Sequence, residues 1–247
     1  MCGIYGITCR DEKFIKSYID TCSYRGPDGS NIWSDDKLTL GHNLLAITSQ
    51  PEQGQQPWQT DKGNILIYNG EIFNYNELLQ TYNFKPKTTC DTELLAFLLD
   101  NYDLRCIEKI DSMHAFAYYN KDQGTITLSR DHAGIKPLFY AETSEGLIFG
   151  SEVKGMLDRV PNARCIDDLA AAAMSYSGLN VTRNTMFCNI KKVLPGETLV
   201  YSIQHKKFIQ NNRTIITPQS NGLLDHEEFR HEAHQTVKMC TLGIRKF

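Results

Sequence analysis

The chain has 247 residues, of which 41% are hydrophobic and 22% charged, and its formal net charge is −3. These proportions are ordinary for a globular protein, and the length allows one large core or two small ones. A chain without a basic surplus is not expected to bind nucleic acid, because the phosphates would not be neutralised. The longest apolar run, at residues 94–99, is too short to span a bilayer, so no membrane partner is expected.

The N-terminus does not resemble a signal peptide, because the charged residues at 10–13 interrupt it early. We therefore expect a cytoplasmic protein with reduced thiols. The eight cysteines show neither a CxxC pair nor a Cys/His ligand spacing, so we predict no disulfide framework and no metal site. Three histidines, at positions 226, 231 and 234, crowd a segment that we interpret as a solvated helix.

Short β-rich segments, separated by turn signals, dominate the first two-thirds of the chain. We predict strands at residues 3–8, 38–48, 64–73, 114–120, 125–130, 137–142 and 146–152. Helical periodicity predicts helices at residues 13–22, 75–82, 92–102 and 167–174. This order of elements indicates two antiparallel sheets covered by helices, because parallel βαβ repetition is absent.

Beyond residue 178 the signal is weaker. Residues 193–203 look like one more hairpin or an edge strand. Residues 210–224 are polar and are typical of a linker, and Asp225 then begins a final helix.

A cysteine stands directly behind the initiator methionine, in the stretch MCGIYGIT. One interpretation is a small apolar residue of a buried strand. The other is chemical, because removal of Met1 would leave Cys2 with a thiol and a free α-amine. The pKa of an α-amine is near 8, so this amine could accept the thiol's proton near neutral pH.

Further motifs favour the chemical interpretation. They are YRGPDGS at 24–30, GHNLLAI at 41–47, YNGEIFNY at 68–75, CDTELL at 90–95, RDHAGIKPLFY at 130–140 and SEVKGM at 151–156, with VLPGE at 193–197 a weaker match. In this order and spacing the chain resembles the N-terminal glutaminase domain of glutamine-dependent asparagine synthetase, a class II glutamine amidotransferase. The resemblance implies an α+β fold, the four-layer αββα sandwich of two antiparallel sheets found in N-terminal-nucleophile hydrolases.

The resemblance also implies the catalytic residues. Cys2 would attack the side-chain amide of L-glutamine with its own α-amine as base. Asn69 and Gly70 would donate hydrogen bonds to the tetrahedral oxyanion. Taken alone, Asn69-Gly70 is a strong hairpin-turn signal, although a glycine also lets a backbone N–H approach a ligand closely.

The same resemblance implies a binding pocket for the rest of the glutamine molecule. Asp91 would bind the α-amine, while Glu71 and the backbone around Ile47 and Thr48 would line the pocket, as would Asn69 and Gly70. Taken alone, Asp91 is an ordinary N-cap for the helix at 92–102. We interpret Arg25 and the pair Arg130-Asp131 as architectural.

One position departs from the family pattern. The family has GH-x-R-L where this chain has Gly41-His42-Asn43-Leu44-Leu45, so Leu44 replaces the arginine that pairs with the substrate's α-carboxylate. A charge-assisted hydrogen bond contributes about 1.5–3 kcal/mol, so its loss would cost roughly 10- to 150-fold in affinity.

The resemblance also suggests how the chain is divided. We predict an amidotransferase domain at residues 2–205, a linker at 206–224, and the start of a synthetase-type domain at 225–247. The family's pyrophosphate loop, SGG-x-DS, is not present in the sequence. We therefore expect no cofactor on this chain, and ATP and Mg on a missing synthetase domain. The chain would be half of a split synthetase or a fragment of a longer one.

The sequence thus predicts an amidotransferase that hydrolyses glutamine to glutamate and ammonia. A synthetase domain or subunit would use the ammonia to make asparagine from aspartate. Two alternatives stay open. The chain could be a binding or regulatory module with a dead pocket, which Leu44 favours. It could instead supply ammonia to a different acceptor, such as a modified base or a sugar.

Overall fold

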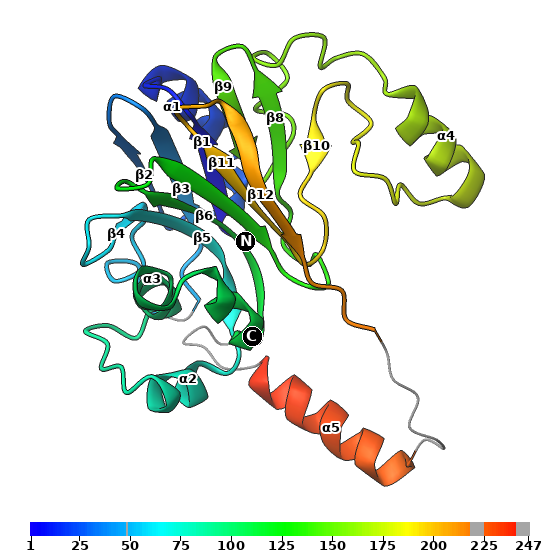
Figure 1. The fold of residues 1–247 in the computed structure, drawn as a ribbon. Helices are drawn as coiled ribbons and strands as arrows, with labels where there is room; N and C mark the ends of the chain where they lie inside the picture. Colours follow the sequence, from blue (N-terminus) through cyan, green and yellow to red (C-terminus); the bar gives the residue numbers. More distant parts are fainter. Residues whose placement is uncertain (48, 218–224, 241–247) are drawn as a thin grey trace.

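The computed structural model describes residues 1–47, 49–217 and 225–240. Its centre is a pair of six-stranded sheets in which every pairing of neighbouring strands is antiparallel. Helices lie on the outer faces of both sheets (Figure 1). The predicted αββα sandwich is therefore confirmed.

The strands run in a defined order in each sheet. Sheet A consists, in spatial order, of β10 (Lys191–Lys192), β8 (Phe139–Thr143), β9 (Gly146–Gly150), β1 (Gly3–Ile7), β3 (Thr39–Leu44) and β2 (Gly29–Ser34). Sheet B consists of β12 (Lys207–Arg213), β11 (Glu197–Ser202), β7 (Thr125–Arg130), β6 (Ser112–Asn120), β5 (Ile65–Ile72) and β4 (Trp58–Gln59). The helices are α1 (Glu12–Thr21), α2 (Tyr75–Thr81), α3 (Asp91–Tyr102), α4 (Asp168–Ser177) and α5 (His226–Met239), with short 3-10 turns η1 (Ser23–Arg25) and η2 (Leu104–Lys109).

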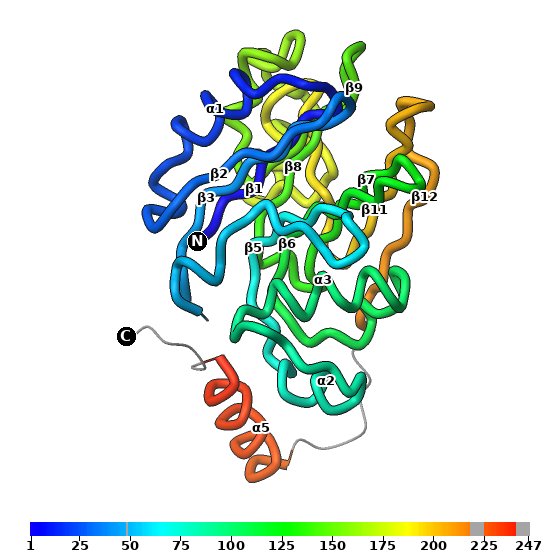
Figure 2. Tube along the Cα trace, turned by 90° about the vertical axis from the view of Figure 1, so that its left-hand side faces the viewer, coloured from blue at the N-terminus to red at the C-terminus, as the bar shows by residue number. Residues whose placement is uncertain are grey.

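Alternation of side chains along the strands produces the layers that Figure 2 shows from the side. On β5 and β6, odd-numbered residues such as Ile67 and Ala117 belong to the core between the sheets. Even-numbered residues such as Leu66 and Phe116 pack in the cluster that includes residues of α2 and α3. The core between the sheets contains, among others, Ile4, Leu40 and Phe149 from sheet A and Ile65, Ile67 and Ala115 from sheet B.

Helix α1 is amphipathic and covers sheet A. The Asp11 side chain caps it by accepting a hydrogen bond of 3.0 Å from the backbone N–H of Phe14. Ile15, Tyr18 and Ile19 face the sheet and are almost completely buried. Each such side chain contributes roughly 1.5–3 kcal/mol of hydrophobic stabilisation.

Helix α3 covers sheet B and positions one of the predicted site residues at its start. Its leucines pack against the outward side chains of β5 and β6. We expected Asp91 to be the N-cap, but the N-cap is Cys90 and Asp91 is the first helical residue. The prediction was wrong because Asp91 has helical backbone geometry, which directs its carboxylate to Tyr68 and Ile72 instead of the helix's own amides.

The sheets differ from the sequence prediction at several strands. The predicted strand at 38–48 ends at Leu44, and the residues after GPD form β2, which was not predicted. The strand β12 lies within the segment 206–224 that we expected to be a linker, so sheet B continues past residue 205. This edge strand carries polar, exposed residues, which is why its composition resembled a linker.

Helix α5 begins after Asp225, whose side chain caps it as predicted, and none of its side chains is buried. Residues 218–224 of the predicted linker, and the segment 241–247 that follows α5, lie outside the described residues. Within the described part of the chain, the helices are too short or too polar to cross a bilayer.

Candidate active site

Cys2 lies immediately before β1, which is a central strand of sheet A. Its Sγ accepts a hydrogen bond from the backbone N–H of Leu45 at 3.2 Å and lies 3.5 Å from the Leu45 carbonyl oxygen. Leu45 follows the last residue of β3, the strand that pairs with β1. The thiol is therefore held at the end of the sheet, where a substrate can approach.

Arg25 anchors the backbone of Cys2. The guanidinium Nε donates to the Cys2 carbonyl oxygen at 3.0 Å, and Nη1 pairs with Oε1 of Glu152 at 2.6 Å. Arg25 is buried, so both contacts form in a low-dielectric environment. This geometry fits the predicted architectural role.

The surroundings of Cys2 affect its acidity in opposite directions. Burial raises the pKa of the thiol, and the carboxylate of Asp91 adds to this effect. The N–H of Leu45, the N-terminal ammonium and Lys136 lower the pKa of the same thiol. A thiol whose pKa is raised by burial needs a nearby base to become a nucleophile.

Asn69 lies inside strand β5, opposite Ala115 of β6. The hairpin turn that Asn69-Gly70 suggested is therefore wrong, because both residues have regular cross-strand partners. Asn69 is 2% exposed, and its Nδ2 is a buried donor without a hydrogen-bond partner among the described residues. Such orphaned donors are rare in folded proteins and require an explanation. An oxyanion that forms only during the reaction would provide one.

Gly70 is required by close packing. A Cβ atom at this position would lie 2.5 Å from both the Met113 carbonyl oxygen and the Tyr68 ring. Any other residue would therefore push β5 away from β6 and displace Asn69.

Two carboxylates lie near the thiol. Asp91 accepts hydrogen bonds from the Tyr68 hydroxyl at 3.1 Å and from the Ile72 backbone N–H at 3.2 Å. Burial raises the pKa of Glu71, and the charge of Asp91 raises it further. Two buried carboxylates side by side favour a cationic ligand group, such as an amine.

These groups line one pocket. Of the predicted site residues, the pocket contains Cys2, Ile47, Asn69, Gly70, Glu71 and Asp91. Thr48 lies outside the described residues. Leu44 also lines the pocket and is 4% exposed. Its apolar side chain is therefore part of the pocket wall. The roles assigned to these residues stay a prediction.

The pocket is narrow. Its free volume is about 40 Å³, which is space for roughly three water molecules. Met1 is among the residues that line it. Removal of Met1 would therefore both free the α-amine of Cys2 and widen the pocket.

The sequence analysis missed several lining residues, among them Gln56 and Lys136. Gln56 accepts a hydrogen bond from the backbone N–H of Tyr68 at 2.6 Å and donates to Thr92 at 3.2 Å. It therefore connects β5 with the start of α3. Lys136 belongs to the RDHAGIKPLFY motif, which was the available signal, but nothing local indicated that its side chain is buried.

Arg130 and Asp131 organise the loop that carries Lys136. Arg130 donates to the carbonyl oxygens of Gly134, Lys136 and Val193, at 2.6, 2.7 and 2.8 Å. Asp131 accepts hydrogen bonds from three backbone N–H groups, those of His114, Ile135 and Lys136. Their contacts fit the predicted architectural role.

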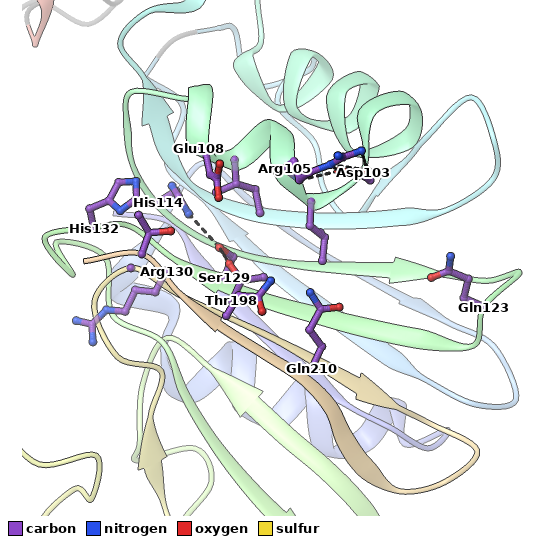
Figure 3. Close-up of a pocket in the computed structure, with 15 residues that line it drawn as sticks. Asp103, Arg105, Glu108, His114, Gln123, Ser129, Arg130, His132, Thr198 and Gln210 are labelled. Carbon is purple, nitrogen blue, oxygen red and sulfur yellow. Dashed lines mark hydrogen bonds and ion pairs between the residues drawn. The ribbon is translucent and has the colours of Figure 1, made fainter. Parts of the chain in front are cut away.

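A larger cavity, of about 390 Å³, lies elsewhere on sheet B, against η2 (Figure 3). It includes His114 and Ser129, whose Nε2 and Oγ lie 3.3 Å apart, and Ser129 also bonds to Thr198. The arrangement does not match a serine nucleophile, because Ser129 is only 1% exposed and His114 Nδ1 bonds to a serine hydroxyl at 2.8 Å, where a triad has a carboxylate. The pocket with Cys2 is therefore the better candidate.

All eight cysteines lie within the described residues, and none of them forms a disulfide. In residues 1–47, 49–217 and 225–240, no three His, Cys, Asp or Glu side chains are grouped so that they could hold a metal ion.

Two antiparallel sheets between helical layers, with a cysteine immediately before the first strand, define an N-terminal-nucleophile hydrolase fold. The family model described as "Glutamine amidotransferase domain" matches residues 1–212. The chain therefore belongs to the class II glutamine amidotransferase family and is homologous to the N-terminal domain of asparagine synthetases.

Several curated proteins are similar to this chain in sequence. "Asparagine synthetase [glutamine-hydrolyzing] 3" of Bacillus subtilis (strain 168) is 31% identical over 215 residues, which cover 82% of this chain and 35% of that protein. "Asparagine synthetase [glutamine-hydrolyzing] 1" of the same organism is 30% identical over 254 residues, covering 97% of this chain and 40% of that protein. The chain thus spans well under half the length of these relatives.

Solved structures agree on the fold. The structure of the allosteric regulatory enzyme of purine biosynthesis superposes with a TM-score of 0.60 at 17% identity, covering 86% of this chain and 49% of that one. The glutamine phosphoribosylpyrophosphate amidotransferase from B. subtilis gives a TM-score of 0.59 at 19% identity, with the same coverage. At these identities the match concerns the fold alone.

Proposed function

We propose that this chain hydrolyses glutamine, with Cys2 as the nucleophile after removal of Met1. The main support for the proposal is that Cys2 and Asn69 lie in the same pocket. A thiol and a buried amide donor without a partner line the same narrow pocket. A nucleophile and a donor for developing negative charge are the two groups that amide hydrolysis requires.

The reaction would proceed in two halves. The α-amine of Cys2 takes the thiol proton as sulfur bonds to the amide carbon of glutamine, and the carbonyl oxygen becomes an oxyanion. Asn69 Nδ2 and the N–H of Gly70 stabilise that oxygen. The resulting α-ammonium returns this proton to the amide nitrogen, the tetrahedral intermediate collapses, and ammonia departs, which leaves a thioester. Water then attacks the thioester, the α-amine again takes the proton, and glutamate and the free thiol are released.

The acidic side chains would orient the substrate. Asp91 and Glu71 provide negative charge for the α-ammonium of glutamine. Asp91 is held in place by Tyr68 and Ile72, so it would contribute to binding with little loss of conformational entropy.

The proposal is tested by intact mass and by a glutaminase assay. We expect the purified protein to be lighter by one methionine and to release glutamate and ammonia from glutamine. Cys2→Ser, processed in the same way, should lose nearly all activity, whereas Cys165→Ser, which changes an exposed thiol, should keep it. Retention of Met1 together with full activity would contradict the mechanism, because the base would be missing.

We further propose that the ammonia serves an ATP-dependent amidation, such as the synthesis of asparagine from aspartate. The support is similarity to relatives whose names include asparagine synthetase. A synthetase domain or subunit would carry out this step and would bind ATP and Mg. Its acceptor would be identified by adding candidate synthetase chains and acceptors to the glutaminase assay.

One observation favours a second function. Leu44 is apolar and lies in the pocket, where a zwitterionic substrate needs polar partners. A protein that does not turn over saturating glutamine, but binds a synthetase chain, would be a regulatory module. Calorimetric titration with glutamine and with the synthetase chain separates these two functions.

A further inference from the structure

The pocket contains a buried lysine for which the proposed reaction has no role. Lys136 is 6% exposed and lines the pocket together with Cys2 and Glu71. Among the pocket-lining residues that the structure describes, it is the only lysine, arginine or histidine. Arg25 lies nearby, but its guanidinium already contacts Glu152 and the Cys2 carbonyl oxygen.

The backbone of Lys136 is fixed on both sides of its side chain. Its N–H donates to Asp131 Oδ2 at 3.0 Å, and its carbonyl oxygen accepts from Arg130 Nε at 2.7 Å. Lys136 is therefore part of a loop whose geometry is determined by a buried carboxylate and a guanidinium. Such a loop can present an ammonium group to a ligand at a defined position.

The ammonium of Lys136 makes no ion pair with any residue in the described ranges. Burial lowers its pKa, while the neighbouring Cys2 and Glu71 raise it. The carboxylates of Glu71 and Asp131 act on this ammonium from beyond ion-pair distance. Burying a cation without a direct ion pair is costly, and an anionic group of a ligand in contact with it would relieve that cost.

Glutamine has one such group. The proposed function assigns its α-ammonium to Asp91 and Glu71 and leaves its α-carboxylate without a partner, since Leu44, which also lines the pocket, is apolar. We infer that Lys136 binds the α-carboxylate of glutamine and so determines the preference of this pocket for a free amino acid. This inference rests on the proposed glutaminase function. In this inference Lys136 determines substrate specificity. The reaction of the Cys2 thiol with the amide does not require Lys136.

The test compares two substrates that differ only at the α-carboxylate. L-glutamine has it, and 4-aminobutanamide keeps the amine and the amide but lacks it. In Lys136→Met, which retains an unbranched chain, we expect the KM for glutamine to rise roughly 10- to 100-fold with kcat within about 3-fold. For 4-aminobutanamide, kcat/KM should change less than about 3-fold. Lys136→Arg should keep most of the glutamine affinity.

A rescue variant adds a second constraint. Leu44→Arg in the Lys136→Met background places a guanidinium in the same pocket, and it should restore at least part of the glutamine KM. Equal loss of kcat/KM on both substrates would overturn the inference, since Lys136 would then act on the Cys2 thiolate. An unchanged glutamine KM in Lys136→Met would overturn it as well.

A binding measurement separates failure of this inference from failure of the proposed function. Cys2→Ala, which cannot form the thioester, should bind L-glutamine in a calorimetric titration, and adding Lys136→Met should weaken that binding at least about 10-fold. Binding that does not depend on Lys136 overturns the inference and leaves the glutaminase proposal intact. An absence of both binding and turnover in the processed protein rejects the two together. Thermal unfolding of each variant shows whether it is folded.

Discussion

Arg25 connects the backbone of Cys2 to Glu152, with Nε 3.0 Å from the Cys2 carbonyl oxygen and Nη1 2.6 Å from Glu152 Oε1. The two contacts join residues far apart in the sequence. The guanidinium is buried, and the side chain of Glu152 is 28% exposed. The position of the candidate nucleophile therefore depends on an ion pair whose arginine is buried and whose carboxylate is partly exposed.

Arg25→Met should lower the free energy of unfolding by about 2–4 kcal/mol, because it leaves Glu152 and the Cys2 carbonyl oxygen without their partner. Urea unfolding measures this change. Arg10→Met is the matched control, since Arg10 also pairs with carboxylates but its side chain is 62% exposed. The control should lose less than about 1 kcal/mol. Equal effects would mean that the buried pair does not contribute specifically.

Asn69→Ala should reduce kcat by about 10²–10³-fold while changing KM little, because the amide donor would act mainly on the oxyanion of the transition state. Its stability should not fall through loss of a hydrogen bond, because Nδ2 has no partner in the described structure. Steady-state kinetics and urea unfolding measure the two quantities.

The control for Asn69 is Asn64, which is 5% exposed and lies just before β5. Its amide donates to Asp100 Oδ1 at 2.9 Å and to the hydroxyl of Tyr118 at 2.8 Å. Asn64→Ala should therefore destabilise the protein without a comparable loss of kcat. The reverse pattern would remove the main argument for the oxyanion role.

Asp91→Asn should raise the KM for glutamine by about 10-fold or more, because the α-ammonium loses a charged partner. The amide oxygen can still accept from Tyr68 and Ile72, so the fold should change little. Glu93→Gln on the same helix is the control, because Glu93 accepts hydrogen bonds from Lys87 N and from Thr88. It should lower stability and leave KM near its original value. A KM effect in Glu93→Gln alone would contradict the assignment.

The free energy of unfolding should depend on pH because two histidines are buried. Burial lowers the pKa of His42 to about 4 and that of His114 to about 4, below the ordinary value of 6.5. Between pH 6.5 and 4 the unfolded chain therefore binds more protons than the folded one, and the stability present above pH 6.5 is lost as the pH falls. The slope approaches about 1.4 kcal/mol per pH unit for each histidine.

His114→Gln isolates one of these contributions. The difference in unfolding free energy between the original protein and the variant should shrink as the pH is lowered from 7 toward 4, because only the original protein must keep His114 uncharged. Urea titrations at several pH values measure it. A difference that is constant with pH would show that His114 does not titrate as its burial implies.

Much of this protein could be predicted from local sequence. The β-rich segments separated by turn signals and the helical periodicity at residues 13–22 and 92–102 predicted two antiparallel sheets covered by helices. The family resemblance of the motifs around Cys2, Asn69 and Asp91 placed the candidate site, and the structure brings these three residues into one pocket. Such features depend on near neighbours in the chain, so a sequence pattern can predict them.

Other features depend on contacts between distant segments, and only the tertiary structure decided them. Asn69-Gly70 has the sequence of a tight turn but stays extended, because pairing with β6 outweighs the local preference. Asp91 could have capped its own helix, yet its carboxylate bonds to Tyr68 and Ile72 on another element. Lys136 is an ordinary charged residue in the sequence. Its burial beside Cys2 and Glu71 follows from the packing of the loop after β7 against the end of both sheets, which no local pattern encodes.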